Sequence, residues 1–151
     1  MSDAENKSKK VQTASEIVGE NCWFGSAFNT YAQGSVNNLP HDHHMLAALV
    51  SPRPMYVIEN TIDWLSPQSA FGCMKTAHKA WEALGVPDNM GFSQTASHNH
   101  CQFPSSQQTE LTAFINKFLL GKDSGTTSVM KSATQTFTDS QWVDWTVPSL
   151  T

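Results

Sequence analysis

The stretch MGFSQTASHNHCQFPSS, residues 90–106, contains the elements that decide the fold. Its first six residues, 90–95, fit a short strand, and the polar loop SHNHC (97–101) follows. A helix capped by a serine at the end of the stretch is then expected to run over residues 105–120 and to end at Gly121. The stretch therefore predicts a strand, a histidine-rich loop and a helix in succession.

The same alternation extends toward the N-terminus. Apolar residues spaced i, i+1, i+4 and i+5 predict a helix over residues 42–50, with Asp42 as its N-cap. The apolar run MYVIE (55–59) predicts a buried strand, and a second helix is expected over residues 73–84, ended by Gly85. Helices that alternate with strands predict an α/β fold with parallel strands and helical crossovers.

Two strands do not form a stable sheet by themselves, so this pattern predicts an incomplete parallel sheet from a larger domain. We expect a disordered N-terminal segment over residues 1–10, because it is charged and almost without apolar residues. Residues 11–124 are expected to form the α/β part, beginning with a short helix near Thr13. Residues 125–151 are expected to form a tail that docks on this part through two tryptophans. These tryptophans are Trp142 and Trp145.

Composition excludes several classes of function. The chain has 151 residues and a formal net charge of -4, and beyond residues 7–10 it has no basic run of the kind that binds nucleic acid. It has no apolar run approaching the roughly 20 residues that span a membrane. The N-terminal sequence MSDAENKSKK has no apolar h-region, so we do not interpret it as a signal peptide.

His100 is the candidate catalytic residue of the loop after the strand at 90–95. Loops at the carboxyl ends of parallel strands hold the sites of α/β enzymes, and α/β-hydrolases order their triad as Ser, acid and His. The alternative is a loop histidine that hydrogen-bonds to backbone. After the strand at 55–59, Asp63 is the geometric candidate for the acid, or it caps a loop. Trp64 is expected to be exposed and able to stack on a sugar ring, unless it is buried.

The histidines and cysteines also allow a zinc hypothesis. His98, His100 and Cys101 carry donors that zinc accepts. Three further histidines lie near the helix at 42–50, at positions 41, 43 and 44. Their spacing matches no established zinc pattern, and we therefore rank this hypothesis below catalysis by His100 and expect no metal.

Seven longer blocks of sequence carry a more specific signal. They are QTASEIVGE (12–20), LPHDHHMLAALV (39–50), PRPMYVIEN (52–60), DWLSPQS (63–69), FGCM (71–74), HNHCQFPSSQQ (98–108) and SQWVDWT (140–146). With these blocks the chain resembles the C-terminal portion of fungal glucuronoyl esterases, carbohydrate esterase family 15. The resemblance covers nearly all of residues 11–151 and implies part of an α/β-hydrolase three-layer sandwich.

The resemblance implies an activity and roles for individual residues. Members of the family are secreted serine esterases that cleave the ester between 4-O-methyl-glucuronic acid of glucuronoxylan and lignin alcohols, without metal or cofactor. By resemblance His100 is the general base. Gln12, Glu20 and Trp64 match positions that contact the glucuronate sugar. The expected partner is thus a glucuronoxylan–lignin ester, and neither nucleic acid nor a membrane.

The resemblance also implies disulfides whose partners this sequence does not contain. Cys101 matches a cysteine that bridges to one beside the nucleophilic serine, and Cys73 matches one that bridges to a cysteine upstream of Gln12. Cys22 matches no family cysteine and receives no role. The three cysteines together are an odd number, which is typical of a missing partner or a reactive thiol.

The sequence departs from the family pattern at the nucleophile and at the acid. It contains neither a Gly-Cys-Ser elbow nor the Glu-Ser-Gly segment of the fungal enzymes, and no serine lies in a Gly-x-Ser-x-Gly pattern. We therefore expect the isolated chain to be inactive as an esterase. The alternative is a non-catalytic glucuronoxylan-binding protein that retains the sugar contacts.

Overall fold

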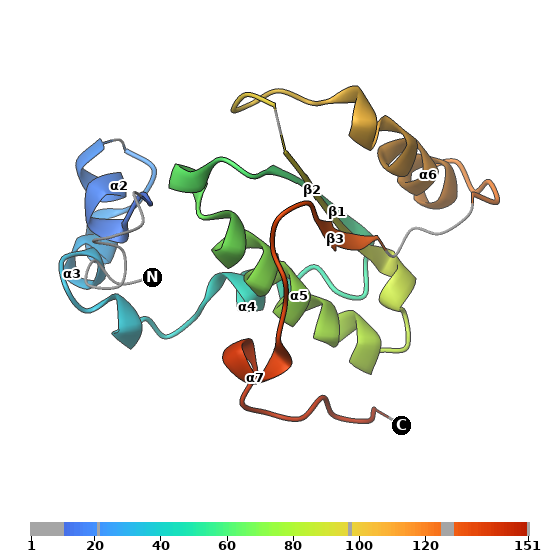
Figure 1. The fold of residues 1–151 in the computed structure, drawn as a ribbon. Coiled ribbons are helices and arrows are strands. Elements are labelled where there is room, and N and C mark those ends of the chain that lie inside the picture. The colour runs from blue at the N-terminus through green and yellow to red at the C-terminus, as the bar shows by residue number, and fades with distance from the viewer. Residues whose placement is uncertain (1–10, 21, 97, 125–128, 151) are drawn as a thin grey trace.

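The computed structural model describes residues 11–20, 22–96, 98–124 and 129–150, and its centre is a parallel sheet (Figure 1). The sheet has three strands in the order β1-β2-β3, and both pairs are parallel. Their bounds are Met55–Asn60 for β1, Met90–Thr95 for β2 and Met130–Ser132 for β3. The predicted α/β class with an incomplete parallel sheet is confirmed. The expectation for residues 1–10 lies outside the described residues.

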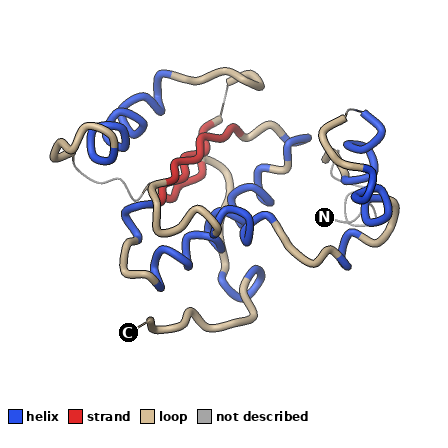
Figure 2. Tube along the Cα trace, turned by 180° about the vertical axis from the view of Figure 1, so that it is seen from behind, coloured by secondary structure: helices blue, strands red, loops and turns tan. Residues whose placement is uncertain are grey.

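Helices cover both faces of the sheet. In Figure 1, α6 lies on one side of the strands and α5 on the other, and α4 packs against α5. Figure 2 shows α2 and α3 as a separate group to one side of the sheet. Among the described residues, no helix is both long and apolar enough to cross a membrane. The helices are α2 (Ala14–Glu20), α3 (Asn29–Ala32), α4 (His43–Ala48), α5 (Pro67–Ala83), α6 (Gln108–Phe118) and α7 (Asp139–Trp142).

The core lies between β2 and α5. Trp81 on α5 and Met90 and Phe92 on β2 are 0% exposed. The indole nitrogen of Trp81 donates to the backbone oxygen of Arg53 at 3.1 Å, so the buried polar atom of this large side chain has a partner. Phe92 packs on Phe71 of α5, with ring centroids 5.6 Å apart. This core packs β2 against α5 just before the loop that follows the strand.

Several predicted helix ends are confirmed. The Asp42 carboxylate accepts from the backbone N–H of His43 at 2.7 Å and caps α4 as expected. At the start of α2, Thr13 and Glu16 form a reciprocal capping box, because the Thr13 N–H donates to the Glu16 carboxylate at 2.7 Å and the Glu16 N–H donates to the Thr13 hydroxyl at 3.3 Å. Gly85, with φ 72°, adopts the left-handed conformation after α5.

Two helix starts differ from the sequence expectations. Helix α5 begins at Pro67 rather than Cys73, because Pro is favoured in the first turn, where its missing N–H costs no hydrogen bond. Serines 105 and 106 do not cap α6: they lie in a 3-10 turn, Ser105–Gln107, and α6 follows from Gln108 without a side-chain cap. The turn moves the start of the α-helix three residues along the chain.

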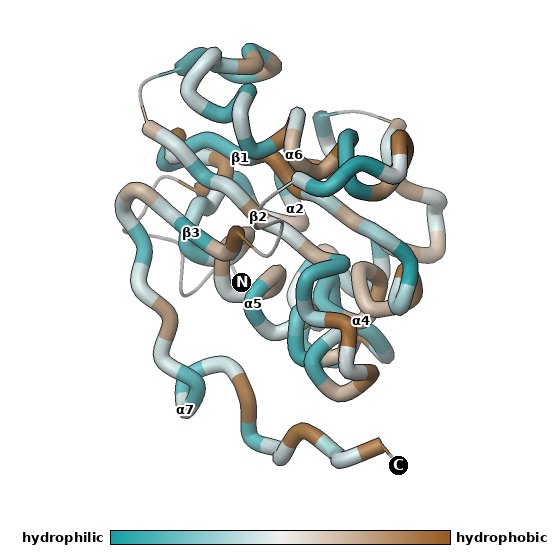
Figure 3. Tube along the Cα trace, turned by 90° about the vertical axis from the view of Figure 1, so that its right-hand side faces the viewer, coloured by the Kyte–Doolittle hydropathy of each residue, from teal (hydrophilic) through white to brown (hydrophobic). Residues whose placement is uncertain are grey.

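The C-terminal segment contributes a strand that the sequence did not predict. Strand β3 pairs with β2, with Phe92 opposite Met130. The chain then runs past α5 to α7 (Figure 3). There Trp142 packs so closely on Gly72 of α5 that a Cβ at this glycine would overlap the indole. Asp139 of α7 accepts from the Lys79 ammonium at 2.8 Å. Residues 125–128 lie outside the described residues.

Candidate active site

Trp64 and His100 meet at the carboxyl edge of the sheet. Trp64 lies in a 3-10 turn, Asp63–Leu65, that follows β1, and His100 lies in the loop that follows β2. Because parallel strands end at the same edge, these two connections are neighbours. The two rings are 5.3 Å apart between centroids, with an interplanar angle of 76°, in an edge-to-face arrangement. Trp64 is 42% exposed, which confirms the expected exposure.

The N-terminal segment brings two more predicted residues to the same place. The backbone N–H of Gln12 donates to the backbone oxygen of Trp64 at 3.0 Å. The side-chain amide of Gln12 in turn donates to the carboxylate of Glu20, at the end of α2. The structure thus gathers Gln12, Glu20, Trp64 and His100, although 88 positions separate the first from the last.

The loop that carries His100 has a tight local conformation. Cys101 has φ 61°, the left-handed region that side chains other than glycine rarely adopt. Asn99 and Gln102 bond reciprocally: the Gln102 N–H donates to the Asn99 oxygen and the Asn99 N–H donates to the Gln102 side chain, both at 3.1 Å. The exposed His100 side chain of this loop contacts Trp64. Ser97 lies outside the described residues.

Glu59 is a carboxyl group of this region that the sequence analysis did not single out. It is half-buried next to the last residue of β1, and its carboxylate accepts from the Asn60 N–H at 3.2 Å. Burial raises the pKa of Glu59, and the Asn60 hydrogen bond and the charges of His100 and His98 partly offset this rise. The histidine loop therefore lies within electrostatic reach of the end of β1.

A cavity of about 310 Å³ opens beside His98. It is bounded on one side by the segment after β1 and on the other by the histidine loop. Nε2 of His98 is buried and has no hydrogen-bond partner among the described residues. The residues that line the cavity are Thr61, Ile62, His98, Asn99 and Gln102. The edge of the sheet is thus open to a small polar group beside His98 and Asn99.

Two other hypotheses from the sequence find no geometric support. Within the described residues, no hydrogen bond or ion pair joins Asp63 to His100. In the same part of the chain no three His, Cys, Asp or Glu side chains converge as metal ligands, so His98, His100 and Cys101 do not form the zinc site considered above. The arrangement favours a proton-transfer group beside an aromatic platform.

Cys73 and Cys101 differ in their surroundings. Cys101 is exposed next to His100, whereas Cys73 is half-buried on α5. Burial, together with the negative charge of Asp42, raises the pKa of the Cys73 thiol to about 11. Cys73 is therefore a poor nucleophile as a free thiol at neutral pH. The disulfides implied by the resemblance remain predictions.

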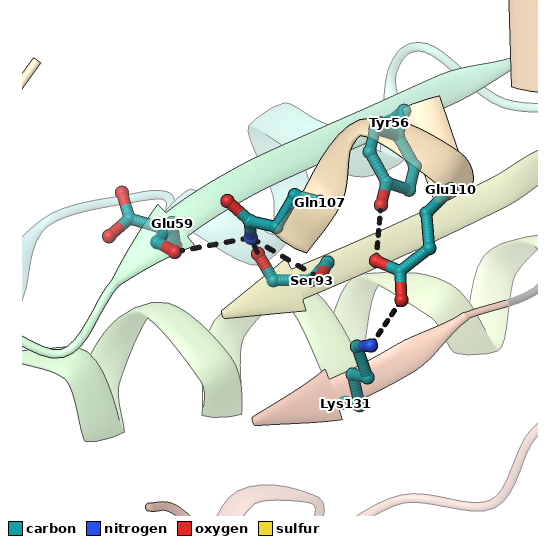
Figure 4. Close-up of polar contacts among 6 residues, drawn as sticks. All are labelled: Tyr56, Glu59, Ser93, Gln107, Glu110 and Lys131. Atoms are coloured by element: carbon teal, nitrogen blue, oxygen red, sulfur yellow. Dashed lines mark hydrogen bonds and ion pairs between the residues drawn. The ribbon is translucent and has the colours of Figure 1, made fainter. Parts of the chain in front are cut away.

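A polar cluster underneath α6 was not predicted from the sequence. The Tyr56 hydroxyl on β1 donates to the Glu110 carboxylate of α6 at 3.0 Å, and Lys131 of β3 forms an ion pair with the same carboxylate (Figure 4). Burial opposes the charge of Glu110, but the hydrogen bonds of its neighbours outweigh burial and lower its pKa. Burial, and next the charge of Glu110, raise the pKa of Tyr56. This cluster connects α6 to both outer strands.

Comparison with known proteins identifies relatives of this chain. The family described as glucuronyl esterase of fungi matches residues 1–85. A 4-O-methyl-glucuronoyl methylesterase from Hypocrea jecorina is 55% identical over 97% of this chain and 31% of its own length. A protein of the same name from Schizophyllum commune is 51% identical over 97% of this chain and 38% of its own length. The chain spans about a third of the length of these curated relatives.

Solved structures agree with the sequence relatives. The glucuronoyl esterase catalytic domain from Hypocrea jecorina superimposes with a TM-score of 0.91 at 53% identity, over 98% of this chain and 40% of that domain. A serine-to-alanine mutant of the glucuronoyl esterase from Sporotrichum thermophile, in complex with methyl 4-O-methyl-beta-D-glucopyranuronate, superimposes with a TM-score of 0.89 at 43% identity, over 98% of this chain and 40% of that chain.

Proposed function

The chain belongs to the fungal glucuronoyl esterase family, and from this premise we propose that it serves the hydrolysis of 4-O-methyl-glucuronate esters, with His100 as general base. One observation carries the proposal: the His100 ring meets the Trp64 ring edge-to-face, and the backbone of Trp64 accepts from Gln12, whose side chain bonds to Glu20. A proton acceptor next to a sugar-binding surface is what ester hydrolysis on a uronic acid requires.

His100 performs two proton transfers in this scheme. Its imidazole accepts the proton of a serine hydroxyl while the serine oxygen bonds to the ester carbonyl carbon. The same proton then passes to the oxygen of the leaving alcohol as the ester bond breaks. Water repeats the sequence and releases the uronic acid. We propose that the serine and the acid are supplied by a part of a glucuronoyl esterase domain outside these 151 residues.

Trp64, Gln12 and Glu20 would bind the sugar. The exposed indole of Trp64 offers an apolar face to the ring and its methoxy group. The amide of Gln12 and the carboxylate of Glu20 offer a donor and acceptors for the sugar hydroxyls. The hydrogen bond between these two side chains fixes their conformations in the free protein, which lowers the entropic cost of binding the sugar.

The family relationship also supports the finer parts of the proposal. We propose a glucuronoxylan–lignin ester as the natural substrate and an extracellular site of action. In an oxidising environment Cys73 and Cys101 would form disulfides with cysteines of the same catalytic domain. The relatives named as 4-O-methyl-glucuronoyl methylesterases support an ester of this sugar acid as substrate.

A second candidate function is binding of glucuronoxylan without catalysis. The observation that favours it is that Gln12, Glu20 and Trp64 come together within this chain, without groups from elsewhere. Titration of the chain with methyl 4-O-methyl-glucuronate, followed by Trp fluorescence and calorimetry, tests it. A Trp64-dependent signal at millimolar ligand supports binding, and no heat or fluorescence change contradicts it.

The catalytic proposal is tested in a chimera in which this chain replaces the matching 40% of the Hypocrea jecorina catalytic domain. We expect the chimera to hydrolyse a benzyl ester of glucuronic acid and the isolated chain to show no turnover. In the chimera, His100→Ala should lower kcat at least about 10³-fold, because the general base is lost. Trp64→Ala should raise KM about tenfold, corresponding to about 1.4 kcal/mol.

His98→Ala is the matched control, since it removes a second histidine from the same loop without removing the proposed base. We expect this variant to retain kcat within about threefold. Turnover by the chimera that persists after His100→Ala would contradict the role of His100. Turnover by the isolated chain would contradict the proposal that the nucleophile comes from outside it.

A further inference from the structure

A buried glutamine lies where the loop that carries His100 returns to the sheet. Gln107 is the last residue of the turn before α6, and its side chain is 0% exposed. Its side-chain nitrogen donates to the backbone oxygen of Ser93 on β2 at 2.6 Å and lies 3.3 Å from the Ser93 hydroxyl (Figure 4). Glutamine is mostly found at surfaces, because a buried amide must find hydrogen-bond partners. Here the amide nitrogen has such partners, whereas Oε1 has none among the described residues.

The same amide reaches the neighbouring strand. Nε2 of Gln107 lies 3.5 Å from the backbone oxygen of Glu59, one residue before the end of β1. Figure 4 shows the Gln107 side chain between the two strands, near the end of β1. One side chain therefore connects the turn before α6 to β1 and β2 together.

The loop between β2 and this turn has mainly local contacts of its own. The hydrogen bonds described for residues 98–104 run between Asn99 and Gln102, from His98 to Asn99, and from the Gln107 N–H to Pro104. Such bonds shape the loop but do not attach it to the sheet. Besides the ring contact between His100 and Trp64, the loop is connected to the sheet through the end of β2 on one side and through Gln107 on the other.

We infer that Gln107 is a positioning residue that holds the loop over the ends of β1 and β2, so that His100 stays against Trp64. The inference rests on the role proposed for His100 in catalysis. Gln107 lies beneath the loop and acts through the backbone. Without the Gln107 amide, the buried Ser93 carbonyl would lose this hydrogen-bond donor. The turn before α6 would then separate from β2 more often, and the loop would move with it.

The test compares Gln107→Met with Gln108→Met by NMR in the isolated chain. Methionine keeps most of the side-chain volume and removes the donor. We expect Gln107→Met to accelerate amide hydrogen exchange of Asn99 and Gln102 at least about tenfold, as expected for more frequent local opening. The His100–Trp64 nuclear Overhauser contacts and the ring-current shift of His100 should weaken. Gln108 is exposed and its side-chain amide donates to Thr112 of its own helix, so its variant should change neither readout.

A Gln107→Met chain that folds and keeps the His100 ring-current shift unchanged would overturn the inference. Such a result would mean that Gln107 contributes to stability but does not position His100. If this variant does not fold, Gln107→Glu gives the answer. A buried glutamic acid stays protonated to a higher pH than usual and can then donate as glutamine does. We expect the His100–Trp64 contact at pH 4 and its loss at pH 7, each compared with the unmodified chain at the same pH. Equal contacts at both values would also overturn the inference.

The chimera separates this inference from the proposed function. Gln107→Met should lower kcat about tenfold or more and change KM by less than about threefold, because the sugar contacts lie outside the loop. An unaffected kcat with a lost His100–Trp64 contact would count against catalysis by His100. An unaffected contact would count against Gln107 alone.

Discussion

Strands β1 and β2 pair along six residues, and they differ in how far they are withdrawn from solvent. Strand β2 has neighbours on both sides and is buried from Met90 to Gln94. Strand β1 has a neighbour on one side and is half-buried from Met55 to Glu59, although its sequence MYVIEN is the more apolar. Burial therefore follows position in the sheet and not the hydrophobicity of the strand.

The different burial of β1 and β2 bears on the surroundings of the candidate site. The buried strand β2 leads into the His100 loop, whereas β1 is apolar and no strand among the described residues pairs with its outer edge. Such an edge is a template for pairing with further chain. The matched catalytic domain contains more than twice the length of this chain, so further structure is available there to cover β1. The contrast between the strands can be tested by substitution.

The largest effect is expected at the centre of β2. Phe92→Ala removes a ring that is 0% exposed and packs on Phe71 of α5, so it leaves a cavity in the core. We expect a loss of about 3–5 kcal/mol in the free energy of unfolding, measured by urea denaturation. Phe92→Leu keeps most of the volume and should cost less than half as much. A loss below about 1 kcal/mol for Phe92→Ala would show that β2 is not the core strand.

A smaller effect is expected where α6 ties the outer strands together. Glu110 bonds to Tyr56 of β1 and Lys131 of β3, and its pKa is lowered in the folded chain. A lowered pKa means that this stabilisation is present above the ordinary value near 4.5 and is lost as the pH falls through the folded value. Glu110→Gln should therefore lower the free energy of unfolding by about 1–2 kcal/mol at pH 7 and by less at pH 3, measured by urea denaturation at both values.

Asp139→Asn is the matched control for Glu110→Gln. It removes a carboxylate that also pairs with a lysine, but its side chain is 69% exposed, against 17% for Glu110. Exposed ion pairs contribute little to stability, so we expect Asp139→Asn to lower the free energy of unfolding by less than about 0.5 kcal/mol at either pH. Equal costs for the two variants would show that α6 does not bind the outer strands through Glu110.

Local signals in the sequence predicted the elements around β2. The strand over residues 90–95 was correct at both ends, and the Asp42 cap followed from residue type alone. The start of α5 was wrong, although proline at position 67 was a readable signal for a first turn. Strand β3 was missed because three residues carry little pattern, and its pairing with Phe92 depends on the tertiary fold.

Some residues of the candidate site could also be predicted from local signals in the sequence, and others could not. His100 and Trp64 follow predicted parallel strands, so their meeting could be expected from topology. Glu20 ends α2 and Gln12 lies just before that helix, and only the family resemblance pointed to them. Gln107 could not be found, because glutamine is usually exposed and the identical residue next to it is exposed here. Its burial depends on how α6 packs on the sheet.

The smallest effect is expected on β1. Ile58 lies on the same face as Tyr56, which contacts Phe114 of α6, but it is only half-buried. Ile58→Val removes one methylene, which lowers the free energy of unfolding by about 0.5–1.5 kcal/mol at a fully buried position. Because Ile58 is only half-buried, we expect a loss below about 0.5 kcal/mol at low protein concentration. The measurement is urea denaturation at several protein concentrations. A cost above about 1 kcal/mol that grows with concentration would mean that β1 is covered by self-association, because only a packed environment makes one methylene so important.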